Sequence, residues 1–238
     1  MKVIFEDEFI LILDKPSGIT VNRSETTLNE KTVQDFVEEK FKIPDEYKDS
    51  DFYKRSGIVH RIDKETSGIL LVGKTKEAFE DLQKHFKERT VEKAYIALVH
   101  GKVVPQEGEI ISPVGRLPWN RKRFGVLAGG REALTTYKVL EVKYLQKDRG
   151  EEALSLLEVK PKTGRTHQIR VHLKSFGHPV FSDVLYGGRK TSRDDRRFLG
   201  RLFLHAAKIE FMHPISGKKV SYQSEISQDL KDFLGQLK

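Results

Sequence analysis

The chain has 238 residues, of which 37% are hydrophobic, so it is long and apolar enough to bury a core of its own. Its 43 Lys and Arg residues exceed its 35 Asp and Glu residues, which gives a formal net charge of +8, and it contains no cysteine. Disulfides, thiolate nucleophiles and cysteine-ligated metals are therefore excluded. No run of about 18 uncharged apolar residues predicts a membrane span, and early acidic residues argue against a signal peptide, so we expect a cytoplasmic protein.

The positive charge is concentrated in the second half of the chain. Residues 1–60 contain 9 Lys and Arg against 13 Asp and Glu, whereas residues 160–210 contain 12 against 4. Such a basic segment is typical of a face that binds a polyanion, and a nucleic acid is the commonest polyanion partner. The alternative is a solvated surface whose counter-charges lie elsewhere in the folded chain.

The first part of the chain is predicted to contain two strands and one helix. Apolar residues indicate strands over residues 2–5 and 9–13, and proline and glycine then predict a tight turn over residues 14–18. Apolar side chains at helical spacing predict a helix over residues 32–41, with a threonine as its N-cap. The polar residues 42–57 are predicted to form a loop.

The middle of the chain contains the most distinctive charge pattern. Residues 58–62 and 69–72 are predicted to pair as strands around a turn, and a helix over residues 76–88 and a strand over residues 93–101 follow. Residues 112–131 combine proline, glycine, one tryptophan and several cations between two predicted strands. We expect them to form a long protruding basic loop, and loops of this length are commonly functional.

The last part of the chain is predicted to be mostly strand. Its predicted elements are strands over residues 132–143 and 153–160, a helix over 166–175, a basic loop over 187–197, strands over 202–212 and 218–222, and a helix over 227–237 capped by Ser227. Many strands with few helices indicate the α+β class, with a mainly antiparallel central sheet and flanking helices. No linker interrupts the pattern, so we expect a single domain over residues 1–238.

Asp63 is the strongest candidate for a catalytic group. It follows Arg61 by two residues, precedes the sequence Thr-Ser-Gly at residues 66–68, and lies on the predicted turn before an apolar strand. A carboxylate in such a position can be held ionised, aimed and partly shielded from water, as an aspartate nucleophile requires. The alternative is an ordinary turn residue whose carboxylate accepts hydrogen bonds from nearby main-chain groups.

Tyr95 and Arg165 are further candidates, each with a plainer alternative. Tyr95 lies in a predicted strand, where it is either a packed aromatic of the sheet or a phenol that stacks on a planar base and handles a proton. Arg165 follows Gly164 near the start of a predicted helix. It is either a surface or phosphate-binding cation or the ion-pair partner that keeps Asp63 ionised.

The histidines do not predict a metal centre. His60, His167, His172 and His205 could converge, but no HExxH pair is present, and His167 and His172 are five residues apart, off one face of a helix. The sequence Gly-Lys-Thr at residues 73–75 lacks the upstream glycine of a phosphate-binding loop. We therefore expect no metal and no cofactor.

Four segments resemble, in order, the sequence motifs of the RluA class of pseudouridine synthases. They are DKPSGITV at Asp14–Val21, HRIDKETSGILLVGKT at His60–Thr75, KAYIALVHG at Lys93–Gly101 and KTGRTHQIRVHL at Lys162–Leu173. The resemblance implies a mixed, mainly antiparallel sheet with a catalytic cleft, and an enzyme that isomerises uridine in RNA to pseudouridine without metal or cofactor. Some members carry an S4-type RNA-binding module before the first motif, and we expect none here.

The resemblance also implies roles for individual residues. Asp63 is the implied nucleophile, Tyr95 packs on the target base, and Arg165 pairs with Asp63. Arg61 helps to displace the base from its helix, and the loop at residues 112–131 resembles the family's RNA-gripping insertion in position and character. The residues that we expect to form the RNA-binding surface are His60, Arg61, Arg116, Trp119, Arg121, Lys122, Arg123 and Arg170. His60 is expected to support the turn of its motif rather than to take part in the chemistry.

The sequence leaves several points open. Asp63 could add to C6 of uracil, attack C1′ of the ribose, or remove a sugar proton to form a glycal, and the C5 proton could be removed by Tyr95, Asp63 or water. The expected partner is a stem-loop of ribosomal or transfer RNA, with no obligatory protein partner and a monomeric chain. A non-catalytic RNA-binding factor and a metal-dependent nuclease are the alternative functions, and the joint presence of Asp63, Tyr95 and Arg165 favours the isomerase.

Overall fold

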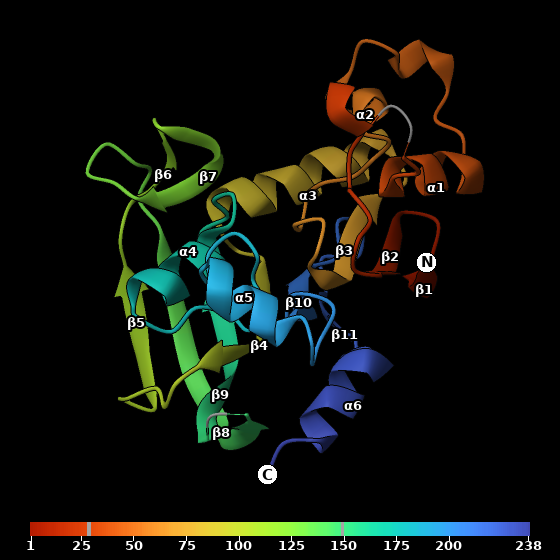
Figure 1. Ribbon diagram of the computed structural model, residues 1–238. Helices are drawn as coiled ribbons and strands as arrows, with labels where there is room; N and C mark the ends of the chain where they lie inside the picture. Colours follow the sequence, from red (N-terminus) through yellow and green to blue (C-terminus); the bar gives the residue numbers. More distant parts are fainter. Residues whose placement is uncertain (28–29, 149) are drawn as a thin grey trace. The chain divides into compact units, whose positions relative to one another are not determined.

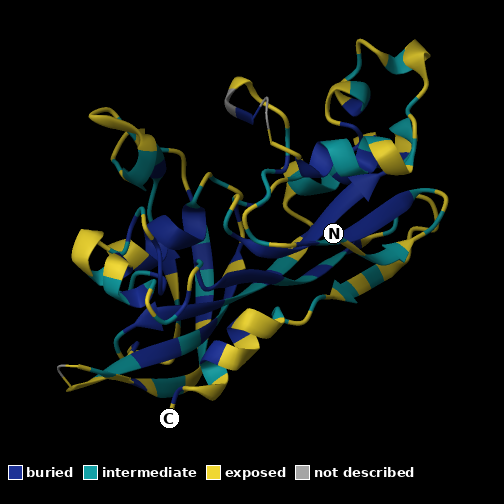
Figure 2. Cartoon of the chain, turned by 45° about the vertical axis from the view of Figure 1, so that its right-hand side comes forward, coloured by how far each residue is buried: buried dark blue, intermediate teal, exposed yellow. Residues whose placement is uncertain are grey.

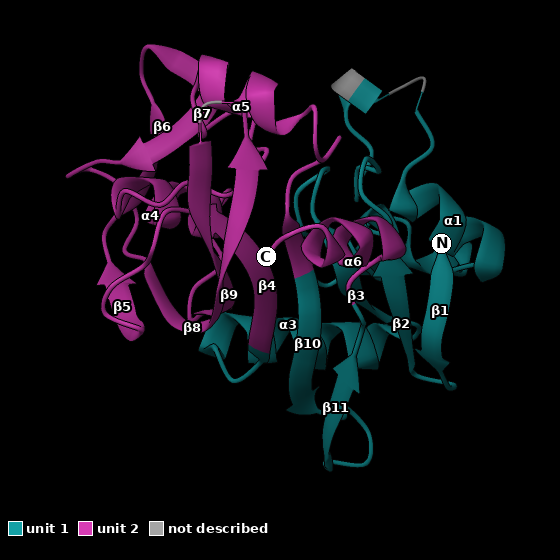
Figure 3. Cartoon of the chain, turned by 60° about the horizontal axis from the view of Figure 1, so that its bottom comes forward, with its two compact units in different colours: residues 1–92, 206–225 teal, residues 93–205, 226–238 magenta. Residues whose placement is uncertain are grey.

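A computed structural model describes residues 1–27, 30–148 and 150–238, and the chain divides into two compact units (Figure 3). Unit 1 comprises residues 1–92 and 206–225, and unit 2 comprises residues 93–205 and 226–238. Strands and helices occur in both units, and the strand pairs are mainly antiparallel, which confirms the predicted α+β class. Of the helices in the described ranges, none is both long and apolar enough to cross a membrane.

Unit 1 is built on strands that follow the order β1, β2, β3 and β10, with β11 paired to β10 (Figure 1). The strands are β1 (Lys2–Glu6), β2 (Ile10–Lys15), β3 (Ser67–Gly73), β10 (Leu204–Met212), which belongs to this unit from Ala206, and β11 (Lys219–Gln223). The helices are α1 (Val33–Lys40), α2 (Asp51–Lys54) and α3 (Lys76–Glu88), and 3-10 turns lie at Glu25–Thr27 and Asp45–Tyr47. The pairs β1–β2, β2–β3 and β10–β11 are antiparallel.

Uninterrupted apolar runs place β2 and β3 at the centre of this sheet. Residues 10–13 of β2 are fully buried, and every residue of β3 is buried (Figure 2). The same core cluster includes Phe52 of α2, Phe79 of α3 and Phe211 of β10. Burial of one such side chain contributes about 1.5–3 kcal/mol, so this core is a stable frame for the chain that enters β3.

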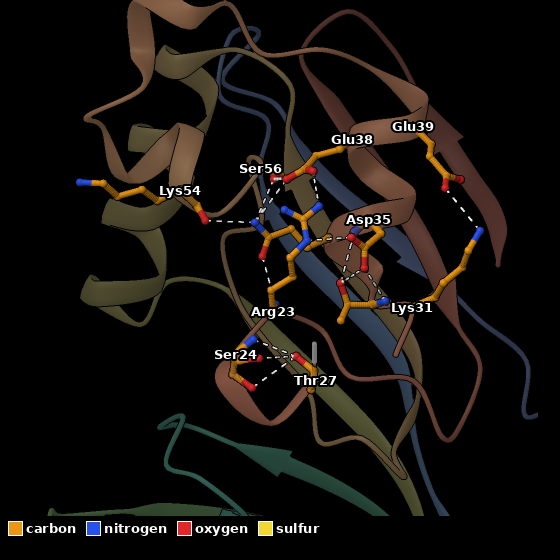
Figure 4. Close-up of polar contacts among 11 residues, drawn as sticks. Arg23, Ser24, Thr27, Lys31, Asp35, Glu38, Glu39, Lys54 and Ser56 are labelled. Atoms are coloured by element: carbon orange, nitrogen blue, oxygen red, sulfur yellow. Dashed lines mark hydrogen bonds and ion pairs between the residues drawn. The ribbon is translucent and has the colours of Figure 1, made fainter. Parts of the chain in front are cut away.

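The N-terminus of α1 confirms the predicted threonine cap. Thr32 Oγ1 accepts a hydrogen bond from Asp35 N at 3.3 Å, and Asp35 Oδ2 accepts one from Thr32 N at 2.7 Å, which is a complete capping box. Arg23 pairs with both Asp35 and Glu38 on the same helix (Figure 4). Hydrogen bonds from Thr32, together with the Arg23 guanidinium, lower the pKa of Asp35 to about 2.

Unit 2 contains a second antiparallel set of strands and a separate hairpin. The strand order is β4, β9, β8 and β5, and β6 pairs only with β7 among the described strands. The strands are β4 (Glu92–His100), which belongs to this unit from Lys93, β5 (Glu107–Ile111), β6 (Val114–Leu117), β7 (Asn120–Val126), β8 (Leu134–Lys147) and β9 (Gly150–Pro161). The helices are α4 (Gln168–Ser175), α5 (Arg189–Asp195) and α6 (Gln228–Gly235).

Helix α6 packs its apolar face on the strands of unit 2. Phe233 of α6 stacks on Phe181 with ring centroids 4.9 Å apart, and both are buried in one cluster with Phe203. Ser227 occupies the predicted N-cap position, but its side chain makes no capping hydrogen bond. Its hydroxyl accepts a hydrogen bond from Arg201 Nη1 at 3.2 Å instead, so the predicted position is correct and the predicted capping contact is wrong.

Two predictions for unit 1 are wrong. Residues 58–62 do not form a strand, because only Ile58 makes a bridge, to Val72, and residues 59–66 are irregular. The apolar residues of this stretch are buried at the side of a loop, which an alternating pattern cannot distinguish from a strand. Residues 42–57 are not all loop, since Ser50 caps the short helix α2 by accepting a hydrogen bond from Tyr53 N at 3.2 Å.

Two predictions for unit 2 are also wrong. Residues 112–131 are not an irregular loop but contain the antiparallel hairpin β6–β7, in which Arg116 lies opposite Phe124. Residues 187–197 are not a loop, since they contain α5. The buried positions of α5 are Ser192 and Asp195, so no apolar stripe marks this helix in the sequence.

Four charged groups in unit 2 form the contact that holds α5. His100 of β4 hydrogen-bonds through Nδ1 to Glu152 Oε1 at 2.7 Å and through Nε2 to Asp195 Oδ2 at 2.9 Å, and Lys147 Nζ pairs with both acids. Asp195 is fully buried and His100 is 8% exposed. Burial alone would lower the pKa of His100, but the hydrogen bonds with Asp195 and Glu152 outweigh it and raise the pKa to about 9.

We predict that this network makes the stability of the protein depend on alkaline pH. Because the pKa of His100 rises on folding from 6.5 to about 9, its protonation stabilises the fold fully below pH 6.5 and ceases to do so as the pH rises through 9. His100→Gln should cost about 3 kcal/mol in unfolding free energy at pH 6, because the fully buried Asp195 and the partly exposed Glu152 lose one of their two cationic partners. Urea unfolding of both proteins from pH 6 to pH 10 should show this difference shrinking, and a constant difference would contradict the prediction.

Candidate active site

Asp63 and Arg61 share one irregular loop of unit 1, residues 59–66, that leads into β3. Ile62 is 5% exposed and anchors the loop in the core, while Asp63 is half-buried and Arg61 is exposed. Thr66 N donates a hydrogen bond to Asp63 O at 3.1 Å, which closes a turn directly after the acid. The loop therefore presents the Asp63 carboxylate from a constrained main chain. Tyr95 and Arg165 belong to unit 2.

Lys15, at the end of β2, contacts the main chain of this loop with its buried side chain. Its side chain is fully buried, and its Nζ donates hydrogen bonds to Pro16 O at 2.9 Å, Ile19 O at 2.8 Å and Lys64 O at 3.0 Å. An ammonium group has three donors, so these three carbonyl oxygens match its capacity. The same charge therefore fixes the turn after β2 and the residue that follows Asp63.

Two further contacts join the same turn to the same loop. Ser17 Oγ donates to Glu65 O at 2.7 Å, and Gly18 N donates to Lys64 O at 2.8 Å. These hydrogen bonds replace the ladder that the loop lacks, because buried main-chain groups must find partners somewhere. The resembling segments Asp14–Val21 and His60–Thr75 are thus brought together in space as one support for Asp63.

Gly68 fixes the end of the loop against β10. Its φ of 108° lies in a region that residues with a side chain rarely adopt, and a Cβ atom there would lie 2.3 Å from Ala206 O. No other residue type fits this close approach. The glycine of the Thr-Ser-Gly sequence is therefore explained by packing rather than by chemistry.

His60 supports the loop from its other end. Its Nε2 accepts a hydrogen bond from Leu71 N at 3.0 Å, and its ring stacks on Phe86 of α3 with centroids 4.7 Å apart. A ring nitrogen that accepts this bond carries no proton, so the imidazole is pinned between β3 and α3. This arrangement is what support of the motif by His60 requires, and its contact with RNA stays a prediction.

Tyr95 lies on β4 opposite Val159 of β9. The side chain is partly exposed and packs against the apolar cluster that contains Ala97, Val159 and Leu204. A phenol in this position has an apolar body held by the core and a polar tip. The structure thus gives Tyr95 the local features that stacking on a base requires.

Arg165 lies on a tight turn before α4 that is organised by Gln168. The buried Gln168 side chain accepts hydrogen bonds through Oε1 from Arg165 N at 3.0 Å and from Thr163 Oγ1 at 2.7 Å. Its Nε2 donates to Leu134 O and to Thr135 Oγ1, each at 3.0 Å. Arg165 Nε donates a hydrogen bond to Glu132 O at 3.1 Å at the surface of unit 2.

Arg170 is a correction to the predicted RNA-binding surface. It is 3% exposed, and its Nε and Nη2 donate to the two carboxylate oxygens of Asp183 at 2.7 and 2.8 Å. The guanidinium also lies over the ring of Tyr186, 5.0 Å from its centroid. Because the guanidinium is buried and paired with Asp183 inside unit 2, we withdraw Arg170 from the residues expected to contact RNA.

The hairpin β6–β7 carries the remaining cations. Trp119 lies at its turn and is 77% exposed, and Arg121 and Lys122 are exposed on β7. Arg116 is exposed as well, but its Nη1 donates to Arg121 O at 2.7 Å and its guanidinium lies over Phe124, which braces the hairpin. Arg123 is only partly exposed. The tip of the hairpin therefore combines one aromatic ring with several cations.

Sequence reasoning missed the supporting roles of Lys15 and Gln168. A lysine that follows the apolar run of residues 10–13 after a single aspartate is a signal for Lys15, because a central strand seldom ends in a charge without a buried acceptor. A glutamine among the basic residues of the third motif offers no comparable signal for Gln168. Within the described ranges, no group of three or more His, Asp or Glu side chains is arranged to hold a metal ion.

Comparisons with known proteins agree with this geometry. The model of a family described as RNA pseudouridylate synthase matches residues 9–175. A curated relative from Nitrosomonas europaea, ribosomal large subunit pseudouridine synthase D, is 39% identical over 98% of this chain and 64% of its own length. An uncharacterized RNA pseudouridine synthase from Aquifex aeolicus is 38% identical over 97% of this chain and 71% of its own length.

A solved structure extends the similarity to the fold. Human RNA pseudouridylate synthase domain containing 1 superposes with a TM-score of 0.73 and 27% identity, covering 97% of this chain and 86% of that one. The chain spans less than two thirds of the length of the relative from Nitrosomonas europaea. A likeness over nearly the whole of this chain includes both loops that carry Asp63 and Arg165.

We predict that Lys15→Met destabilises the protein by about 3 kcal/mol, because a side chain of similar length leaves three partly buried carbonyl groups without their charged donor. Urea unfolding at pH 7 measures the loss. Lys64→Met is the matched control, since the Lys64 side chain is half-exposed and pairs with Glu30 on the surface. It should change stability by less than about 1 kcal/mol. Equal effects of the two substitutions would refute the supporting role of Lys15.

Proposed function

Because the chain belongs to the RNA pseudouridylate synthase family, we propose that it isomerises uridine in RNA to pseudouridine. The observation that carries the proposal is the loop of Asp63, which Lys15 holds through the carbonyl of the next residue. A main chain fixed so close to a half-buried carboxylate is what a group that attacks in one geometry requires.

The proposed reaction breaks the N1–C1′ bond of uridine, turns the detached uracil and joins its C5 to C1′. The proton on C5 is then lost to solvent and N1 gains a proton, so the reaction is a net isomerisation that needs no oxidant, reductant or other co-reactant. The proposal leaves open whether Asp63 adds to C6, attacks C1′ or promotes a glycal. In each route the acid acts as a carboxylate, and we propose that Arg165 pairs with it and keeps it ionised.

We propose that Tyr95 packs on the uracil while the base is detached, since its apolar body is held by the core of unit 2. The target base must first leave its helix, which costs a few kcal/mol. Arg61 is exposed on the loop of Asp63, and we propose that it occupies the space that the base vacates. The hairpin tip, with Trp119 and the cations of β7, is proposed to hold the neighbouring nucleotides by stacking and phosphate contacts.

We propose a stem-loop of large-subunit ribosomal RNA as the substrate. The relatives from Nitrosomonas europaea and Neisseria meningitidis that match this chain are named for the large ribosomal subunit. Transfer RNA is the alternative that the sequence left open. Transcripts of both kinds, each with tritium at C5 of uridine, distinguish the two because only the substrate releases tritium to water.

We predict that Asp63→Asn lowers the rate of tritium release by about 1000-fold or more, because an amide cannot act as the carboxylate nucleophile. RNA affinity should change little, since the substitution replaces one carboxylate oxygen by an amide nitrogen and removes no cation. Glu65→Gln is the matched control on the same loop and should keep activity within a few-fold. An Asp63→Asn enzyme with more than a tenth of the normal rate would refute the proposed chemistry.

We predict that neutralising the hairpin by Arg121→Ala, Lys122→Ala and Arg123→Ala weakens RNA binding and lowers its salt dependence. Each lost contact with a single-strand phosphate should reduce the slope of log affinity against log salt by about 0.7, so three contacts should reduce it by about 2. The rate of the chemical step on fully bound RNA should stay within a few-fold. Fluorescence anisotropy from 50 to 300 mM salt measures the slope. Lys42, Lys48 and Lys54, exposed in unit 1, give a control triple variant of equal charge change.

A further inference from the structure

Helix α5 presents three cations that no part of the proposed chemistry uses. Arg189, Lys190 and Arg193 are exposed, and none of them forms an ion pair with another residue in the described ranges. Lys190 and Arg193 are three positions apart, and Arg189 and Arg193 are four apart, so the three side chains share one face of the helix. The following Arg197 is also exposed and has only a surface pair with Asp148, at 3.4 Å.

The opposite face of α5 is fixed by buried charge rather than by apolar packing. Asp195 is fully buried, and its carboxylate accepts hydrogen bonds from His100 Nε2 at 2.9 Å, Ser182 N at 3.1 Å and Lys147 Nζ at 3.3 Å. Ser192 Oγ donates to Gly188 O at 2.7 Å within the same turn. An isolated helix of seven residues would not be stable in water, so these contacts are what keep α5 formed and in place.

The segment that enters α5 also anchors the hairpin. Tyr186 is 5% exposed, and its hydroxyl accepts a hydrogen bond from Phe124 N of β7 at 3.0 Å and contacts His167 Nδ1 at 2.8 Å. Tyr186 and Phe124 lie in one apolar cluster with Val171 of α4. The hairpin, the turn after Arg165 and the start of α5 are therefore joined within unit 2 by one tyrosine.

We propose that the exposed face of α5 is a second RNA-binding surface, which contacts phosphates of a double-stranded segment outside the target loop through Arg189, Lys190 and Arg193. This inference rests on the proposed function, because it assigns a further part of the RNA to the same enzyme. The sequence of α5, RKTSRDD, has no aromatic side chain for stacking on bases. Three fixed cations without an aromatic ring recognise the charge and shape of a helix rather than its sequence.

The side chains on the exposed face of α5 differ from those of the hairpin, so the two surfaces suit different parts of an RNA. The hairpin carries Trp119, whose exposed ring suits unpaired bases, whereas α5 carries only cations on its exposed face. A stem-loop offers both kinds of RNA at once, with unpaired bases at its tip and a duplex below. The two surfaces of unit 2 therefore match the two parts of such a substrate.

The test uses the full chain with Arg189→Gln, Lys190→Gln and Arg193→Gln combined. Glutamine preserves helix propensity, so α5 should remain formed and the unfolding midpoint should stay unchanged. The probes are an RNA duplex of about two dozen base pairs with unrelated sequence and a short oligouridine, both measured by fluorescence anisotropy. We expect duplex affinity to fall by about 10-fold and its salt slope by about 3, at about 0.9 for each lost duplex phosphate contact, with oligouridine affinity within about two-fold of normal.

The matched control is Lys102→Gln, Lys138→Gln and Lys174→Gln, three exposed lysines of the same unit. It removes the same net charge and should change duplex affinity by less than about two-fold. An equal loss in both triple variants, or no loss in the α5 variant, would overturn the proposal. These readouts do not depend on tritium release, so failure of the Asp63 experiment and failure of the α5 experiment are distinguishable.

Discussion

One buried ammonium group determines where the main chain of the loop that carries Asp63 can lie. Lys15 ends the central strand β2 and places three donors among the carbonyl oxygens of Pro16, Ile19 and Lys64. A buried charge is tolerated only when its donors are satisfied, so the turn after β2 and the loop of Asp63 must form together. The energetic cost of burying Lys15 is therefore coupled to the main-chain geometry at Lys64, the residue that follows Asp63. Ser17 and the main chain of the same turn add to the same attachment.

The same principle recurs at the other functional elements of the chain. Gln168 accepts hydrogen bonds from Thr163 and from the main chain of Arg165, and Asp195 fixes α5 through His100 and Lys147. In each case a buried polar side chain replaces the regular hydrogen bonds that a strand or a long helix would supply. Loops held in this way keep a defined shape while remaining at the surface, where an RNA can reach them. The apolar core of each unit supports its strands and helices, and the buried side chains of Lys15, Gln168 and Asp195 position the loops and the short helix.

How much of this was predictable depended on whether the signal was local. Helix α3 and the Thr32 cap of α1 follow from the spacing of nearby side chains, and both were predicted correctly. Helix α5 was missed because its buried face is polar and its partners lie on distant strands. Arg170 was assigned to a surface because nothing in its neighbourhood reveals that Asp183, thirteen residues later, takes its charge. Asp63, Tyr95 and Arg165 were proposed from their local sequence and from the family resemblance, whereas the side chains that hold their segments in place were missed.

The close approach of Gly68 to Ala206 has a consequence for how this chain can vary. The gap at Gly68 admits no Cβ atom, and the side chain of the next residue, Ile69, is buried in the core. Inserting or deleting a single residue between Lys15's carbonyl partner at position 64 and this glycine would push a side chain into the main chain of β10. The segment that carries Asp63 therefore has a fixed length. The Lys15 ammonium holds it at residue 64, and the close contact of Gly68 with β10 holds it at the other end.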